Sequence, residues 1–149
     1  MPMIDAVTIR PAQTRDAVAC AAIPNDWIDD ADWMPRVHSH SGVTDDYRDF
    51  VFAKRAVFVS CDPPLGFIAL DTENAFVTEL DFAQPGHGTG RSLLDHAKFR
   101  SRKLDLWTFV ANNYARRFYE GEGFTEVSQI DRNNKEGLPD VLYPRGCDV

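Results

Sequence analysis

The sequence predicts a single mixed α/β domain over residues 1–149, with helices flanking a central sheet that is mostly antiparallel but holds one parallel pair of strands. Its 149 residues suit one domain with its own core. A content of 44% hydrophobic and 26% charged residues is typical of a globular chain. Segments of strand-like and helical periodicity alternate in the order β-α-(α)-β-β-β-α-β-α-β-β, and no repeat or linker divides them.

The N-terminal part is predicted to be mainly helical after one short strand. Val7 and Ile9 alternate with polar neighbours, as in a strand, and Thr14 and Thr44 are suitable N-caps for helices. The elements expected in order are a strand over 6–12, a helix over 14–23, a second helix or a long loop over 25–36, a loop over 38–43 and a helix over 44–54.

The remaining chain changes period and becomes rich in strands. The elements expected are strands over 56–61, 65–70 and 76–82, a helix after the glycines at 86–90, a strand over 104–111, a helix over 112–124, and strands over 125–130 and 140–144. The first three strands are short and closely connected, which favours an antiparallel meander. The strand–loop–helix–strand unit around the glycines predicts one parallel pair.

The net charge of −7 argues against a general nucleic-acid binder, but it is unevenly spread. Residues 84–117 hold seven of the 16 Lys/Arg and two of the 23 Asp/Glu, a local charge of +5, which leaves −12 for the rest. Such a basic island indicates an anion site or a solvated helix face. No apolar run is long enough for a membrane span and no secretory signal is expected, and three scattered cysteines favour a reduced, cytoplasmic protein.

The basic island begins at Gly86-His87-Gly88-Thr89-Gly90, just before a predicted helix. Glycines allow a close approach of the backbone, and a helix start offers unpaired N–H groups to an anion. The stretch lacks the G-x-x-x-x-G-K-[ST] of a P-loop, and Arg91 stands where a dinucleotide fingerprint needs its third glycine. A nucleotide-binding domain of either type is therefore excluded, and the choice between a phosphate cradle and a tight loop stays open on these residues alone.

One strand downstream, the chain closely resembles the signature of the GCN5-related N-acetyltransferase (GNAT) superfamily. The matching positions are Asn112, Ala115, Phe118, Tyr119, Gly123 and Phe124. In that superfamily the signature follows a [Gln/Arg]-x-x-Gly-x-Gly loop by one strand, as it does here. The resemblance covers most of the chain and implies the GNAT fold of a small bacterial enzyme, with two parallel strands split apart.

The resemblance implies acetyl-coenzyme A (acetyl-CoA) as the bound co-substrate. Its pantetheine would run along the strand before the glycines, and its pyrophosphate would lie on the loop and the helix start. The residues implied in binding it are Leu80, Phe82, Ala83, Gly86, His87, Gly88, Thr89, Gly90, Arg91, Asn112 and Arg116. Pro85 departs from the family, because it stands where the family has Gln or Arg and it lacks an N–H donor.

The resemblance also implies direct transfer of an acetyl group to a primary amine of a small molecule or peptide. Tyr119 would protonate the leaving thiolate, and an N–H near Phe82 would hold the carbonyl oxygen. Glu79 and Asp81, on one strand face by alternation, are the candidates for the base.

Candidates for the acceptor site are Trp33, Arg36 and His38, together with Trp27; both tryptophans are also expected as packing anchors. No metal site is expected, since the H-x-H of His38 and His40 has no third ligand nearby. The superfamily allows a homodimer. A non-catalytic CoA-binding module on the same fold remains the alternative.

Overall fold

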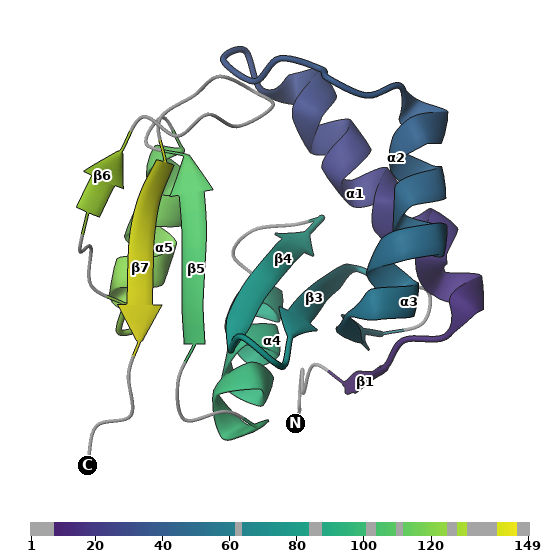
Figure 1. Cartoon of the computed structure of the whole chain (residues 1–149). Coiled ribbons are helices and arrows are strands. Elements are labelled where there is room, and N and C mark those ends of the chain that lie inside the picture. The colour runs from purple at the N-terminus through teal and green to yellow at the C-terminus, as the bar shows by residue number, and fades with distance from the viewer. Residues whose placement is uncertain are drawn as a thin grey trace, which may run out of the picture.

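The computed structural model describes residues 8–61, 64–83, 88–100, 104–109, 112–124, 128–130 and 140–145, and its strands form one sheet in the order β1-β2-β3-β4-β5-β7-β6 (Figure 1). The strands are β1 Ile9–Pro11, β2 Ala56–Ser60, β3 Gly66–Asp71, β4 Phe76–Phe82, β5 Leu104–Phe109, β6 Ser128–Ile130 and β7 Asp140–Arg145. All the pairings are antiparallel except that of β4 with β5. The predicted mixed sheet with one parallel pair is confirmed.

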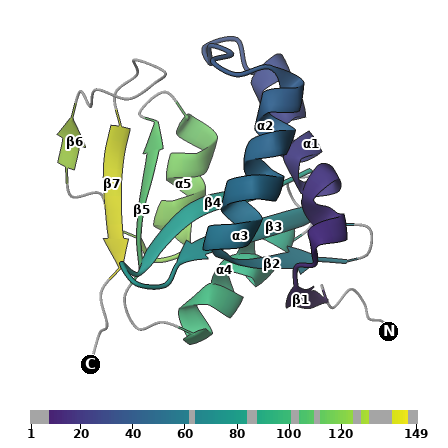
Figure 2. The same cartoon turned by 45° about the vertical axis from the view of Figure 1, so that its right-hand side comes forward.

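Helices cover both faces of this sheet. They are η1 Thr14–Asp16, α1 Ala17–Asp30, α2 His40–Asp46, the π-helical turn η2 Tyr47–Val51, α3 Phe52–Lys54, α4 Thr89–Arg100 and α5 Asn113–Gly121. Figure 2 shows α1, α2 and α3 in front of the strands and α4 behind them. The site is built where β4 and β5 meet between these two layers.

Two hydrophobic cores lie on the two faces of the sheet, because successive strand residues point to opposite sides. Toward α4 and α5, the core holds Phe58, Ile68, Leu70, Val77, Leu93, Leu94, Ala97, Leu104, Leu106, Tyr119, Phe124 and Tyr143. Toward α1 and η2, it holds Cys20, Ala21, Tyr47, Val51, Val57, Val59, Phe67 and Ala69. Each large buried side chain contributes about 1.5–3 kcal/mol, so both helical layers are firmly attached to the strands.

The α1 helix corrects the prediction of a break after residue 23. It runs through Pro24 to Asp30, although proline removes one helical hydrogen bond. Asn25, which is buried, explains the continuation, because its Nδ2 donates to the His40 carbonyl (3.2 Å) and its side-chain and main-chain oxygens accept from Arg36. Tertiary hydrogen bonds thus override the local preference of the proline.

The α2 helix corrects a second prediction, that residues 38–43 form a loop before a helix capped by Thr44. The helix begins at His40, and its N-cap is Ser39, whose Oγ accepts from the Gly42 N–H (3.0 Å). Serine is among the strongest N-cap residues, and glycine at Gly42 misled the sequence interpretation because it is a poor helix former.

The parallel pair β4–β5 is joined at its beginning and open at its end. In the described strands, the register is the single pair Phe76–Asp105, and the Asp105 N–H donates to the Ala75 carbonyl (2.9 Å). After this pair, each strand is hydrogen-bonded, over its described residues, to its outer neighbour alone, β4 to β3 and β5 to β7. Figure 1 shows β4 and β5 diverging. The split that the family resemblance implied is therefore present.

Candidate functional site

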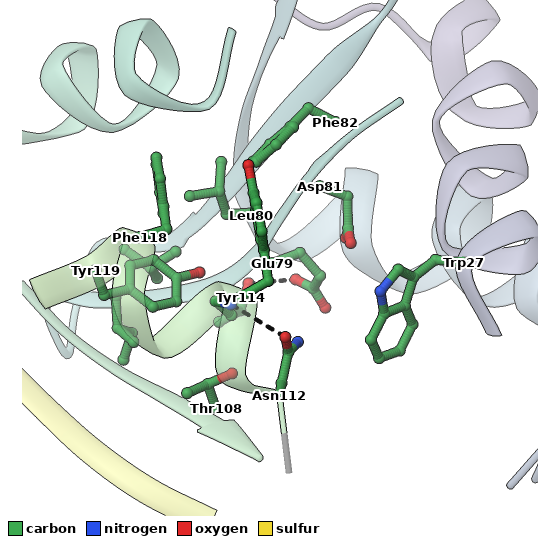
Figure 3. A pocket seen from close by; sticks show the side chains of 14 residues that line it. Trp27, Glu79, Leu80, Asp81, Phe82, Thr108, Asn112, Tyr114, Phe118 and Tyr119 are labelled. Atoms are coloured by element: carbon green, nitrogen blue, oxygen red, sulfur yellow. Dashed lines mark hydrogen bonds between the residues drawn. The ribbon is translucent and has the colours of Figure 1, made fainter. Parts of the chain in front are cut away.

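A cavity of about 460 Å³ occupies the opening between β4 and β5 (Figure 3). Its walls come from α1, β4, β5 and α5. The lining residues are Trp27, Val77, Thr78, Glu79, Leu80, Asp81, Phe82, Leu106, Thr108, Asn112, Tyr114, Ala115, Phe118 and Tyr119. The predicted base candidates and the predicted acid therefore meet in one space.

A β-bulge at Thr78 sets which side chains of β4 face which layer. The β3–β4 register pairs Ala69 with Glu79 but Leu70 with Val77, so Thr78 has no partner on β3. Glu79 and Asp81 follow the bulge and stand opposite Ala69 and Phe67, whose side chains belong to the core under α1. The two carboxyl groups therefore share the α1 face, as alternation predicted.

The Thr78 hydroxyl holds the carboxyl group of Glu79. Thr78 Oγ1 lies 3.1 Å from the Ala69 carbonyl oxygen and also within hydrogen-bonding distance of Glu79 Oε2. The Thr78 hydroxyl is the donor toward both oxygens and shares its one hydrogen between them, so the Glu79 carboxyl group accepts from Thr78. Burial raises the pKa of Glu79, and the hydrogen bond from Thr78 opposes this shift.

Asp81 differs from Glu79 in having no neutral partner. Among the described residues, no side chain hydrogen-bonds or ion-pairs with its carboxylate. Burial, followed by the charge of Glu79, raises the pKa of Asp81 to about 7. Tyr47 lies on the same side of the sheet, and its pKa is raised by burial and then by Asp81 and Glu79. Asp81 is thus a carboxylate poised to exchange a proton near neutral pH.

Tyr119 approaches the cavity from the other face of the sheet. It is buried on α5, within the core shared with α4, and its ring packs against Phe118 and Phe124 at centroid distances of 5.4 and 5.8 Å. Burial and then the charge of Asp81 raise its pKa, so the phenol keeps its proton at neutral pH. The expectation that Tyr119 is a core residue and the expectation that it reaches the site are compatible.

The backbone of β4 presents hydrogen-bonding groups to the opening. The Ala83 N–H donates to the Leu65 carbonyl (2.8 Å), so the backbone groups of Ala83 face β3. This orientation alternates along antiparallel strands, and the N–H and C=O of Phe82 and Leu80 therefore point away from β3, toward β5. Leu80 and Phe82 are placed as a ligand of this strand requires, whereas the Ala83 N–H is already used.

The described part of the glycine loop combines an open position with a tight one. Gly88 has φ +77°, and a Cβ there would meet nothing within 4 Å. At Gly90 a Cβ would come within 2.5 Å of the Phe82 ring, so that glycine is required for packing. Thr89 is buried, while Arg91 is 72% exposed and reaches Asp95 and Glu122 only at 4.0 and 3.8 Å. Gly86 and His87 lie outside the described residues.

Asn112 and Arg116, both predicted to bind the cofactor, have roles within the chain. Asn112 caps α5, its Oδ1 accepting from the Ala115 N–H (3.1 Å), and it also lines the cavity. Its amide nitrogen is the group that remains for a ligand. Arg116 is directed toward β7, where its Nε lies 3.4 Å from the Tyr143 hydroxyl.

The predicted acceptor residues lie at the connection between α1 and α2. Arg36 ties this connection together, donating to Asn25 Oδ1 (3.0 Å), to the Asn25 carbonyl (2.9 Å) and to Asp29 Oδ1 (2.8 Å). His38 is exposed, and its carbonyl accepts from Arg36 (3.1 Å). Trp33 packs edge-on against Trp27 at 5.4 Å. Of these candidates, Trp27 is the one among the cavity-lining residues.

Sequence reasoning missed Thr78, Thr108 and Tyr114 as lining residues. Helical spacing could have indicated Tyr114, because it lies four residues before Phe118 and so on the same face of the helix. Within the described ranges, no three His, Cys, Asp or Glu side chains are grouped to hold a metal ion. The helices described there include none with the length and apolar content needed to cross a membrane.

Comparison with known proteins finds neither a matching family model nor a matching curated protein. Solved structures do match over nearly the whole chain. YjaB from Escherichia coli, in its apo form, has a TM-score of 0.77 and 21% identity over 94% of this chain and 97% of its own. The protein yncA from Salmonella typhimurium, solved with its cofactor acetyl-CoA, has a TM-score of 0.68 and 22% identity over 97% and 95%.

A third structure names the fold family. It is a GNAT-family acetyltransferase from Bacillus cereus, with a TM-score of 0.75 and 16% identity over 97% of this chain and 100% of its own. These likenesses agree with the split parallel pair and with the helices on both faces. The chain has the fold of the GCN5-related N-acetyltransferases, as the signature at Asn112–Phe124 implied.

Proposed function

We propose that the protein transfers the acetyl group of acetyl-CoA to a primary amine of a small molecule or peptide, without a covalent enzyme intermediate. The observation that carries this proposal is the cavity in the split between β4 and β5. Carboxyl groups enter it from the α1 face and a phenol enters it from the α5 face. Acyl transfer to an amine uses a proton acceptor for the attacking nitrogen and a proton donor for the leaving sulfur.

The chain offers acetyl-CoA a suitable set of groups. The N–H and C=O groups of Leu80 and the C=O of Phe82 face the split, where they can pair with an extended amide chain, and the Phe82 N–H is left for the acyl group. The start of α4 offers N–H groups beside the open Gly88, and the exposed Arg91 can turn toward a phosphate. When bound, acetyl-CoA would supply the activated acyl group as a thioester.

The residues of the cavity can then carry the proton transfers. Asp81 accepts a proton from the ammonium form of the acceptor, whose nitrogen attacks the thioester carbon. The N–H of Phe82 holds the carbonyl oxygen as negative charge develops on it. The carbon–nitrogen bond forms, the carbon–sulfur bond breaks, and Tyr119 gives its proton to the sulfur. The second proton that the nitrogen loses is released to solvent, from which the Tyr119 phenol is protonated again. We assign the base to Asp81 rather than Glu79, because Glu79 is engaged by Thr78.

Thiol release from acetyl-CoA across a panel of amines tests the proposal. Tyr119→Phe should lower kcat about 100-fold, in the range expected for the loss of general acid catalysis. Tyr143→Phe is the matched control. It removes a hydroxyl from the same core, but that hydroxyl donates to Glu120 (2.9 Å), and Tyr143 does not line the cavity. If the Tyr119→Phe variant has the same kcat as the control, Tyr119 is not the general acid.

The alternative is a CoA-binding module without catalysis. Pro85 keeps it open, because a proline offers no N–H to the phosphates and so changes how the family's co-substrate would be held. Thermal stability with CoA separates the two. Stabilisation by CoA without turnover of any amine would favour the binding module. If CoA gives no stabilisation and no amine is turned over, neither acetyl transfer nor CoA binding is the function.

A further inference from the structure

We propose that the acceptor is a cationic amine with an apolar body and no anionic group near the nitrogen, held by Asp81 and Trp27. This inference rests on the proposed acetyl transfer and names its substrate class. It separates amines such as tryptamine from amino acids such as tryptophan, which differ by one carboxylate beside the reacting nitrogen.

The charge of the cavity lining is the first argument for a cationic acceptor. Its lining contains two acidic residues, Glu79 and Asp81, and no Lys, Arg or His among the described residues. With Glu79 held by Thr78, Asp81 is the carboxylate left to meet an ammonium group. The α-carboxylate of an amino acid would lie within about 5–6 Å of Asp81, where like charges at an effective dielectric near 20 disfavour binding about 100- to 300-fold, and less where water screens them.

Nearby cations do not offset that repulsion. Arg36 donates from all three of its nitrogens to Asn25, Asp29 and the His38 carbonyl, so its guanidinium is committed to the α1–α2 connection. Arg55 contributes some positive potential at Glu79, but its guanidinium lies over the Phe50 ring (5.2 Å) and it does not line the cavity. The described site therefore favours a cation and has no assigned partner for an anion.

The aromatic side chains that line the cavity are the argument for an apolar body in the acceptor. Trp27 comes from α1, with its ring held edge-on by Trp33, and Figure 3 shows Trp27 and Asp81 at one side of the cavity and Tyr119 at the other. Tyr114, 49% exposed, and Phe118 add further apolar surface from α5. Aromatic faces bind carbon skeletons and also attract an adjacent cation, so the walls and the charge select the same molecule.

Matched pairs of acceptors test this substrate class. We would measure kcat/KM for tryptamine against tryptophan and for isoamylamine against leucine. Binding of the same four compounds to the protein saturated with CoA would be measured by calorimetry, which needs no turnover. The amine of each pair should be favoured at least about 10-fold in both measurements.

Variants connect the preference to the two residues. Asp81→Asn should reduce the binding preference for the amine to less than about 3-fold, because the repelling charge is gone. Asp30→Asn, an exposed acid on α1 outside the cavity lining, removes the same net charge and should leave the preference unchanged. Trp27→Ala should weaken the binding of tryptamine more than that of methylamine, which has no body to place against the ring.

The outcomes distinguish this inference from the proposed function. Acetylation of amino acids as efficient as that of their amines, a preference that survives Asp81→Asn, or no binding of any amine would overturn the inference. The first two results would leave acetyl transfer standing. An intact binding preference with no turnover would support the inference and remove the proposed catalysis.

Discussion

Gly90 is predicted to contribute to stability because its missing side chain makes room for the Phe82 ring. A Cβ at Gly90 would lie 2.5, 2.9 and 3.0 Å from Cε1, Cζ and Cδ1 of that ring. Carbon atoms pack best at about 3.5–4.0 Å, so the ring would have to retreat by about 1 Å. Overpacking of this kind costs about 1–3 kcal/mol, and alanine returns at most about 1 kcal/mol of helix propensity.

We therefore expect Gly90→Ala to lose about 1–2 kcal/mol of unfolding free energy, or roughly 2–8 °C in Tm for a domain of this size. The displaced Phe82 ring lines the split, so the KM for acetyl-CoA should rise as well. Denaturant unfolding and thiol-release kinetics measure the two effects.

A second substitution checks the cause. Phe82→Leu removes the atoms that the new Cβ would meet, so Gly90→Ala should cost little in that background, with a coupling of about 1 kcal/mol or more. Gly121→Ala is the control, because a Cβ there meets nothing within 4 Å. A Gly90→Ala variant as stable as the wild type, or equally destabilised with Leu at position 82, would refute the reasoning.

Three further perturbations follow from the described contacts. Because the pKa of Asp81 is raised to about 7, kcat/KM should rise as the pH passes through 7, and Asp81→Asn should flatten that rise in a pH–rate profile. The same shift means that charging Asp81 costs stability as the pH rises from about 4 to 7, so Asp81→Asn should be more stable than the wild type at pH 8 in denaturant unfolding. Asp16, 2% exposed, accepts from Arg10 at 2.9 and 3.0 Å, and this bond holds its pKa below 3.8. Asp16→Asn should therefore cost about 3 kcal/mol at pH 7, and this cost should fall as the pH drops through the lowered pKa of Asp16, where the wild type loses the pair too; a cost that does not change with acidification would contradict this. Ser39→Ala should cost about 1 kcal/mol in thermal unfolding by uncapping α2, and no loss would mean that the Ser39–Gly42 hydrogen bond contributes nothing.

Strand periodicity made the β4 face predictable. Glu79 and Asp81 are two residues apart, and alternation alone places them together. That prediction survived the bulge because Thr78 precedes both residues. The bulge itself has no sequence signal, since it depends on how β4 fits against β3, and with it the hydrogen bond that distinguishes Glu79 from Asp81 was beyond prediction.

The acceptor side was harder to predict because long-range contacts decide its helices. Pro24 and Gly42 are local helix breakers, yet Asn25 holds α1 together and Ser39 starts α2. Trp27 therefore lies on a continuous helix that brings it to the cavity. Strand alternation indicated Asp81 and the glycine spacing indicated an anion site, whereas the acid role of Tyr119 came from the family resemblance. The structure describes the positions of Tyr119, Asp81 and residues 88–90.

The split between β4 and β5 also leaves the sheet with two internal edges. The backbone groups of Leu80 and Phe82 that a neighbouring strand would normally satisfy point into the opening instead. An extended amide chain lying there would act as a missing length of strand and complete an interrupted hydrogen-bond ladder. The stability of the whole sheet would then depend on ligand concentration, and the two halves of the molecule would be most firmly joined when the co-substrate lies between them.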